Sequence, residues 1–395
     1  MSTPAPDVVP TTAYQSEIYL AGLAGKTPAL PTDLTQLEGL AEQRLDSGPF
    51  WYVAGGAGSG ATMRANRAAL GTWRIVPRMM REATVRNLAS TVLGTELPAP
   101  VLLAPVGVQS IVHPDGELAV ARAAASVGLP MVLSTASSHT IEEVAEASGA
   151  GPRWFQLYWP TDDDVTISLL YRARAAGYTT LVVTLDTWTL GYRPHDLDQS
   201  YLPFIRGVGT AIPFSDPAFR AKLAAAPEDD LMAAVGHWLP MFTGTALRWD
   251  RLSLLRANWD GPIVLKGIQH PDDARRALQA GMDGIVVSNH GGRQVDGAVA
   301  ALDTLPGIVS AVDGRAAVLF DSGVRSGADV LKALALGADA VLLARPYVYG
   351  LALGGEDGVR HVLRCLLAEL DVTLGLSGYA DIAELTPDAL VHGRP

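Results

Sequence analysis

Short apolar runs alternate with helical patterns over residues 100–370. The run at residues 284–287 is short and β-branched, which favours a fully buried strand over a helix. Gly177, Gly281 and Gly337 each close a helical segment and precede a similar run, as in a helix-to-strand unit. The predicted strands are residues 101–104, 131–134, 154–157, 181–184, 263–266, 285–288, 317–320 and 341–344. The predicted helices are residues 117–127, 141–147, 163–176, 250–258, 272–280, 304–312, 328–336 and 358–370.

Eight strands that alternate with helices predict an α/β fold, a closed parallel (β/α)8 TIM barrel rather than an open sheet. We expect a single domain over residues 1–395, with an N-terminal arm and helix in residues 1–50 and the barrel in residues 100–370. Residues 187–247, between the fourth and fifth strands, are far longer than a normal connection. We expect them to form a partly ordered lid loop.

Two features precede the barrel. Thr32 or Asp33 is the expected cap of a helix that runs to about Leu45. At residues 50–58, aromatic side chains are followed by glycines. This pattern fits either a tight loop that displays a ring or a helix end with buried aromatics, and the two interpretations have similar weight.

The composition limits the class of protein. Hydrophobic residues make up 48% of the 395 residues, which is enough for a large core. The 41 acidic and 30 basic residues give a net charge of −11 without a basic cluster, which argues against nucleic-acid binding. The sequence shows no membrane span, signal peptide or metal motif, so a cytoplasmic setting is expected. The single cysteine, Cys365, excludes an internal disulfide and is expected in the core.

Residues 288–294, Ser-Asn-His-Gly-Gly-Arg-Gln, follow a predicted strand and carry candidate chemistry. His290 is a candidate proton acceptor at a strand end. The two glycines allow close approach of the backbone to a ligand, and Arg293 can bind a carboxylate bidentately. The motif therefore indicates chemistry on a small organic acid. The alternative is an ordinary strand-to-loop turn with a solvated histidine and arginine.

Polar groups also follow most of the other predicted strands, where barrel enzymes place their catalytic groups. The loops after strands seven and eight, with Arg325 and Arg345, suit a phosphate. Lys266 either stabilises negative charge on a reduced ring system or is a rim lysine paired with an aspartate. Asp186 either holds His290 in one tautomer or caps a helix.

These motifs resemble the FMN-dependent 2-hydroxy acid oxidising family. The resemblance extends from residue 51 to the C-terminal end and rests on residues 288–294, residues 321–325 and Arg345-Pro346. Within the family, the chain looks closest to lactate 2-monooxygenase, on residues 17–19, 52–56, 265–276 and 319–323. The resemblance implies FMN as cofactor, a small L-2-hydroxy acid and O2 as substrates, and a homotetramer or homo-octamer.

The resemblance also implies a role for individual residues. His290 would take a proton from the substrate hydroxyl or from its α-carbon, and Asp186 would pair with His290. Arg193 and Arg293, helped by Tyr52, would bind the carboxylate. Tyr158 would hydrogen-bond the substrate oxygen, and Lys266 would lie near N1 and O2 of the flavin. The other implied FMN contacts are Ala104, Pro105, Val106, Ser134, Gln156, Thr184, Ser288, Asp321, Ser322, Gly323, Arg325, Ala344 and Arg345.

Some positions depart from the family pattern. Ser322 and Ala344 stand where many members have glycine, and Val106 replaces a hydroxyl residue. Gly107 leaves room beside the expected flavin edge. The expected reaction is that of lactate 2-monooxygenase, which converts lactate and O2 into acetate, CO2 and water. An oxidase that releases keto acid and hydrogen peroxide is the alternative, and a non-redox barrel enzyme with a phosphorylated substrate is a more distant one.

Overall fold

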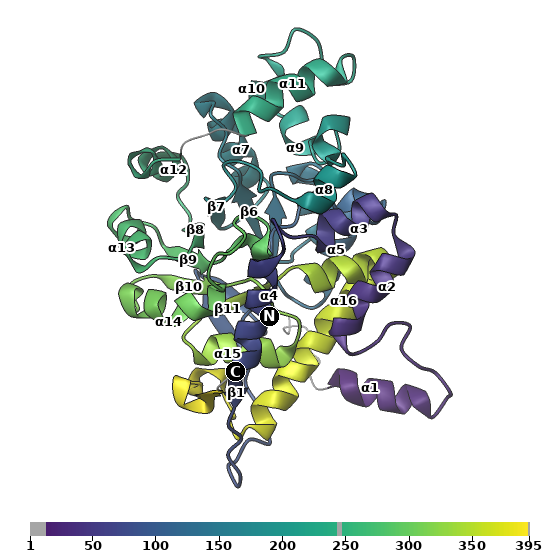
Figure 1. Cartoon of the computed structure of the whole chain (residues 1–395), viewed down its shortest axis with the longest axis vertical. Coiled ribbons are helices and arrows are strands. Elements are labelled where there is room, and N and C mark those ends of the chain that lie inside the picture. Colours follow the sequence, from purple (N-terminus) through teal and green to yellow (C-terminus); the bar gives the residue numbers. More distant parts are fainter. Residues whose placement is uncertain (1–12, 243–246, 394–395) are drawn as a thin grey trace, which may run out of the picture.

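The computed structural model describes residues 13–242 and 247–393. In this part of the chain, eight parallel strands close into a barrel in the order β10-β11-β4-β5-β6-β7-β8-β9, so the predicted (β/α)8 barrel is confirmed (Figure 1). Each predicted strand is present, with ends that differ by at most two residues. The barrel strands are β4 (Val101–Leu103), β5 (Met131–Ser134), β6 (Arg153–Leu157), β7 (Leu181–Thr184), β8 (Ile263–Ile268), β9 (Gly284–Val287), β10 (Ala317–Phe320) and β11 (Ala340–Leu343).

The helices around the barrel agree with the prediction except near the C-terminal end. They are α5 (Gly116–Ser126), α6 (Ile141–Ser148), α7 (Asp163–Ala175), α12 (Leu252–Asn258), α13 (Pro271–Gln279), α14 (Ala301–Val312), α15 (Gly327–Ala335) and α16 (Arg345–Leu376). The helix predicted at residues 358–370 is therefore much longer. It is interrupted by non-helical backbone at Gly354 and Gly355. Because these glycines break the helical spacing of apolar residues, the sequence pattern did not indicate the first half of the helix.

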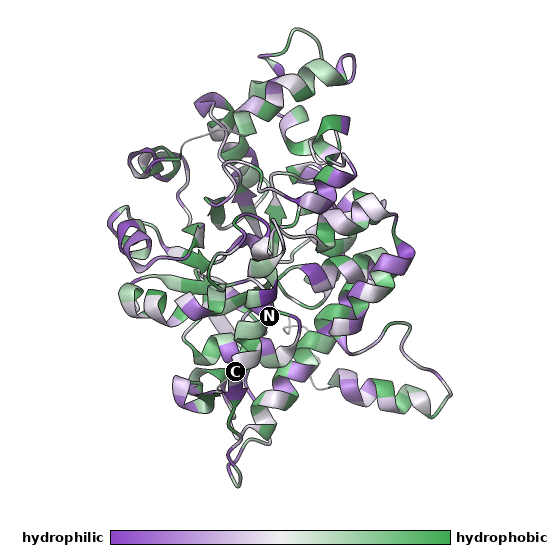
Figure 2. Ribbon diagram, in the orientation of Figure 1, coloured by the Kyte–Doolittle hydropathy of each residue, from purple (hydrophilic) through white to green (hydrophobic). Residues whose placement is uncertain are grey.

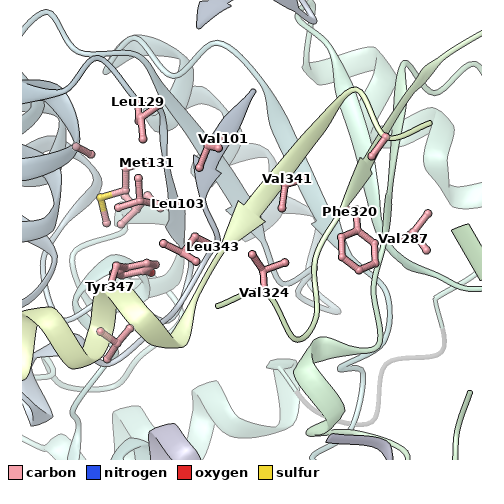
Figure 3. Packing of buried hydrophobic residues seen from close by; sticks show 14 of the residues in the cluster. Val101, Leu103, Leu129, Met131, Val287, Phe320, Val324, Val341, Leu343 and Tyr347 are labelled. Atoms are coloured by element: carbon pink, nitrogen blue, oxygen red, sulfur yellow. The ribbon is translucent and has the colours of Figure 1, made fainter. Parts of the chain in front are cut away.

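The core has two layers because successive strand side chains point to opposite faces. Leu102, Val264 and Leu342 belong to the layer inside the barrel. The alternate side chains pack outward against the helices, as Figure 3 shows for Leu103 and Leu343 beside Tyr347 of α16. In Figure 2 the hydrophilic residues of α13 lie on the outside of the molecule. Both faces of the barrel strands are therefore buried, which explains why these strands appear as continuous apolar runs.

The long connection after β7 contains several short helices, so the partly ordered lid loop that the sequence predicts has more regular structure than its pattern indicated. Its elements are α8 (Pro194–Asp198), the 3₁₀ turn η3 (Pro203–Arg206), α9 (Ala211–Phe214), α10 (Pro217–Arg220) and α11 (Leu231–Phe242). They lie together beyond the ends of β6 and β7 in Figure 1. Phe219 contacts Trp238, which contacts Phe242, with ring centroids 5.7 Å apart in each pair. These aromatic contacts give the short helices a core of their own. Residues 243–246 of the predicted lid lie outside the described residues.

The N-terminal elements are α1 (Ala13–Gly22), η1 (Leu34–Gln36), α2 (Leu37–Arg44), α3 (Ser47–Ala54) and α4 (Ala61–Thr72). Asp33 is the cap of η1, because its carboxylate accepts from the Thr35 amide at 3.0 Å. Phe50 and Val53 are buried in α3, so the aromatic residues belong to a helix end rather than to a loop. The first twelve residues of the predicted arm lie outside the described part. Cys365 is buried, as expected.

Two segments far apart in sequence meet below the barrel. The strand β1 (Trp73–Ile75) directly follows α4 and pairs antiparallel with β12 (Leu390–His392). The hairpin of β2 (Ser90–Val92) and β3 (Thr95–Leu97) packs Val92 and Leu97 against the inner layer of the barrel.

No helix in the described ranges is long and apolar enough to cross a membrane.

Candidate active site

A cavity opens at the C-terminal ends of the barrel strands. The empty space between its lining residues is about 1040 Å³, part of it open to solvent, which leaves room for a small ligand or cofactor. Most of the predicted site residues line it, namely Tyr52, Ala104, Pro105, Val106, Tyr158, Arg193, Lys266, His290, Arg293, Asp321, Ser322, Gly323, Arg325, Ala344 and Arg345. Ser134, Gln156, Thr184 and Ser288 are buried at the strand ends nearby. The predicted residues therefore lie close together, as expected for residues at the C-terminal ends of barrel strands.

His290 and Asp186 form a hydrogen-bonded pair at this cavity. The Nδ1 atom of His290 lies 2.9 Å from Oδ1 of Asp186. Burial lowers the pKa of His290, although Asp186 opposes this effect. Burial alone would raise the pKa of Asp186, but the charges of His290 and Lys266 lower it to about 2. At neutral pH the carboxylate is therefore ionised and accepts from Nδ1–H of a neutral imidazole. Nε2 is then left as a proton acceptor.

Two arginines and two tyrosines gather beside this pair. Arg193 is buried, and its Nη2 donates to Oε1 of Gln294 at 2.8 Å. The guanidinium of Arg293 lies 5.4 Å from the centre of the Tyr52 ring. Burial, together with the charges of Arg193 and Arg345, lowers the pKa of Arg293 to about 9. Burial raises the pKa values of Tyr52 and Tyr158, so both phenols remain hydrogen-bond donors. This end of the cavity suits a carboxylate.

A second concentration of positive charge lies where the loops after β10 and β11 meet. Burial and the charge of Arg345 lower the pKa of Arg325 to about 10. Within the described residues, the side-chain hydrogen bonds of both arginines go to backbone carbonyl oxygens. Gly323 has a φ of +97°, and a Cβ there would lie 3.1 Å from the side chain of Asn66. A buried and a half-buried arginine, neither with a carboxylate partner among the described residues, lie beside a glycine turn and the start of α16 and suit a phosphate.

Lys266 lies between these two ends and is buried. Its Nζ is 3.0 Å from Oδ2 of Asp321 and 2.9 Å from Oγ of Ser288. Burial lowers its pKa, but Asp321 and Asp186 outweigh this effect and raise it, so the ammonium is charged at neutral pH. The alternative of a rim lysine was right about an aspartate partner and wrong about exposure. A fixed cation at this position can stabilise negative charge on a bound ring system.

Several residues around the site were not found from the sequence. Phe204 and Phe242 come from the helical connection and line the cavity together with Tyr158. Their only sequence signal was the aromatic content of that connection. Thr187 Oγ1 lies 3.0 Å from Oδ1 of Asp186. Asn66 of α4 has no sequence signal, although its amide exchanges two hydrogen bonds with the amide of Asn289 at 2.8 and 2.7 Å.

Comparison with known proteins identifies the family to which the chain belongs. The family model described as FMN-dependent dehydrogenase matches residues 41–392. The chain belongs to this family. An FMN-dependent alpha-hydroxy acid dehydrogenase of Penicillium citrinum is 50% identical over 382 residues, which cover 96% of this chain and 95% of the relative. An L-lactate oxidase of Lysinibacillus sphaericus is 40% identical over 381 residues, which cover 96% of this chain and 98% of the relative. A crystal structure of mandelate oxidase is 39% identical, with a TM-score of 0.82, and the match covers 93% of this chain and 100% of that one.

Membership in the FMN-dependent dehydrogenase family agrees with the charges in the cavity. The protein is an FMN-dependent 2-hydroxy acid oxidoreductase, which excludes a non-redox barrel enzyme as its function. A phosphate-binding end, a buried lysine in the middle and a carboxylate-binding end with a base match a flavin nucleotide and an organic acid that lie side by side. The donor set therefore fits FMN.

Proposed function

We propose that this protein oxidises a short L-2-hydroxy acid of the lactate type and that it acts as a lactate 2-monooxygenase. The observation that carries the proposal is the arrangement of the His290–Asp186 pair beside Arg193 and Arg293 in one cavity. A proton acceptor next to an anion-binding pair suits a substrate that carries a hydroxyl group next to a carboxylate.

Substrate binding and proton transfer are assigned to separate groups. Arg193 and Arg293 hold the substrate carboxylate, with the phenol of Tyr52 as a further donor. Tyr158 hydrogen-bonds the substrate oxygen. Nε2 of His290 takes a proton from the hydroxyl or from the α-carbon, and Asp186 stabilises the imidazolium that forms. When bound, FMN supplies the chemistry that accepts two electrons from the substrate and passes them to O2.

The cofactor is assigned to the other half of the cavity. Arg325, Arg345 and Gly323 hold the phosphate, and Lys266 stabilises negative charge on the reduced ring. The polar strand ends and the edge of β4 complete the ring and ribityl contacts, namely Ala104, Pro105, Val106, Ser134, Gln156, Thr184, Ser288, Asp321 and Ala344. The hydrogen bond between Nε2 of Gln156 and Oγ1 of Thr184, at 2.9 Å, fixes two of these side chains in place.

The monooxygenase outcome requires the product to stay in the cavity, and two features of the cavity wall support this. Phe204 and Phe242, from the helical connection, add two aromatic side chains to the lining of the cavity. A Cβ at Gly107 would lie 2.7 Å from the carbonyl oxygen of Ala136, so only glycine fits this approach, and it adds no side chain to the cavity wall. Pyruvate that stays bound is decarboxylated by the hydrogen peroxide formed beside it, which gives acetate, CO2 and water. An oxidase that releases pyruvate and hydrogen peroxide is the second candidate, and the 40% identity to an L-lactate oxidase favours it.

The proposal is tested by adding L-lactate to the yellow protein without oxygen, then admitting air and identifying the products. Bleaching followed by acetate and CO2 supports the monooxygenase, whereas bleaching followed by pyruvate and peroxide identifies an oxidase. A protein that retains FMN and is bleached only by larger 2-hydroxy acids contradicts the lactate assignment. The His290→Ala variant is the matched control, because it is expected to retain FMN and lose nearly all reduction by substrate.

We further propose that the protein is a cytoplasmic homotetramer or homo-octamer. Tyr19 on α1, Leu23 directly after α1, and Met79 and Met80 in the loop after β1 are large apolar side chains at the surface. Subunit contacts cover exposed apolar side chains, and these four residues are our candidates for such contacts. Light scattering of the purified protein measures the number of subunits, and a monomer would contradict this proposal.

A further inference from the structure

Ser322 lies in the loop after β10 with an unusual backbone conformation. Its φ is +86°, in the left-handed region that favours glycine. A serine in this conformation is strained and persists only where its surroundings hold it. Its side chain is buried. The contacts of its hydroxyl group explain what the serine provides that glycine does not.

The hydroxyl of Ser322 binds both neighbours of His290. Its Oγ accepts from the backbone amide of Asn289 at 3.2 Å and from that of Gly291 at 3.1 Å. The same oxygen donates to Oδ1 of Asp321 at 2.7 Å. A hydroxyl has one donor and two acceptor positions, so these contacts use its full capacity. The side chain of Ser322 therefore serves the histidine loop, whereas the sequence suggested a contact to FMN.

The loop that Ser322 holds is itself strained. His290 has a φ of +58°, and its amide donates to Oγ of Ser288 at 3.0 Å. The amides of Asn289, His290 and Gly291 are thus each bound by a serine hydroxyl. The strands before these two loops are neighbours, since Val287 pairs with Phe320, and both side chains are labelled in Figure 3.

The contacts of Ser322 also close a ring through the buried lysine. Asp321 accepts from Ser322 with Oδ1 and pairs with Lys266 through Oδ2 at 3.0 Å. Lys266 donates to Ser288, which in turn binds the amide of His290. Glycine at position 322 would remove one side of this ring. The amides of Asn289 and Gly291 would then lose their shared acceptor.

We propose that Ser322 is a positioning residue that fixes His290 relative to Lys266 by tying the histidine loop to the Asp321–Lys266 pair. This inference rests on the proposed function, in which His290 takes the substrate proton and Lys266 stabilises the charge that develops on the ring. Both groups must keep their places while the proton and the electrons leave the substrate. The ring of hydrogen bonds joins them through side chains that are already in position.

Two variants and one control test this role. Ser322→Ala removes the hydroxyl and keeps the strained backbone, whereas Ser322→Gly removes the hydroxyl and suits the positive φ. If Ser322→Ala does not fold, Ser322→Gly still tests the role of the hydroxyl. Ser148→Ala is the control, because Ser148 is also a buried serine, and its hydroxyl donates to the carbonyl of Val144 in its own helix at 2.8 Å.

The readouts are the rate of anaerobic bleaching by L-lactate, the FMN content, and hydrogen–deuterium exchange of residues 288–294. We expect both Ser322 variants to retain FMN and to be reduced roughly 10- to 100-fold more slowly, with little change in KM, since small misplacements of a reacting group have effects of this size. Exchange of residues 288–294 should be faster in both variants and unchanged in Ser148→Ala.

Wild-type rates and wild-type exchange in both variants would overturn the role of Ser322 and leave the proposed function intact. Loss of FMN from both variants would also overturn it, because the hydroxyl would then serve the cofactor. A wild-type protein that no 2-hydroxy acid reduces would overturn the proposed function and the role of Ser322 together.

Discussion

Replacement of Asp186 by asparagine tests how much the negative charge of Asp186 contributes to the basicity of His290, the proposed base. The carboxylate of Asp186 is 2.9 Å from Nδ1 of His290 and has little exposure to solvent. Asparagine keeps the size of the side chain and an oxygen that accepts from Nδ1–H. The variant therefore removes the negative charge and leaves the position of the imidazole nearly unchanged. His290 is expected to become a weaker base, because its protonated form loses the charge that stabilises it.

The structure gives the size of the effect. The decrease in the pKa of Asp186 from 3.8 to about 2 corresponds to roughly 2 kcal/mol in favour of the carboxylate. His290 accounts for only part of this shift, because Lys266 and Thr187 also lower the pKa of Asp186. Loss of about 1–2 kcal/mol of imidazolium stabilisation in the transition state slows reduction by roughly 5- to 30-fold. Because the pKa in the folded protein is depressed, this contribution to folding is present above about pH 4 and is lost as the pH falls toward 2.

Stopped-flow reduction by L-lactate without oxygen, measured across pH, checks this prediction. Asp186 opposes the decrease in the pKa of His290, so its removal lowers that pKa further. The acidic limb of the pH profile should therefore move to lower pH, while the plateau rate falls. A reduction rate equal to that of the wild type, or an acidic limb that moves to higher pH, would refute the reasoning.

Three further variants test other parts of the site. Gln294→Leu removes an amide that accepts from Arg193 at 2.8 Å and donates to the Asp186 carbonyl at 2.8 Å. The KM for lactate should rise by roughly tenfold or more, as for loss of a hydrogen bond to a charged group, and an unchanged KM in steady-state kinetics would contradict this. Arg325→Met should weaken FMN binding by a similar factor in a fluorescence titration of the apoprotein. Unchanged affinity would exclude Arg325 from the phosphate site. Phe242→Ala removes a ring 4.8 Å from that of Tyr158 and should raise the kcat/KM of mandelate relative to lactate by roughly tenfold. An unchanged ratio would show that Phe242 does not limit the size of the substrate.

The barrel was predictable because each of its strands is buried on both faces. A strand such as Gly284–Val287 then has no polar alternation and stands out between helical patterns. Once the strands were placed, their polar ends had to meet at one end of the barrel. Lys266, His290 and Arg345 line one cavity for this reason.

Other features depend on contacts that no local pattern carries. The helices after β7 include several of four or five residues, which is too short for a clear helical period. They are held by contacts between aromatic side chains, such as that of Phe219 with Trp238. The sequence also drew attention to Ser322 as a departure from glycine. It gave no sign that the hydroxyl turns toward the histidine loop, because that depends on the register between β9 and β10.

The pairing of β1 with β12 bears on the order in which the enzyme folds during its synthesis. β1 directly continues α4, the helix whose Asn66 exchanges hydrogen bonds with Asn289 beside His290. Its partner β12 follows the whole barrel in the chain, so a ribosome makes all eight barrel strands of the described structure before β1 can pair. A nascent barrel therefore lacks the partner of the strand that continues α4, and the described pairing of β1 forms only after β12 has left the ribosome.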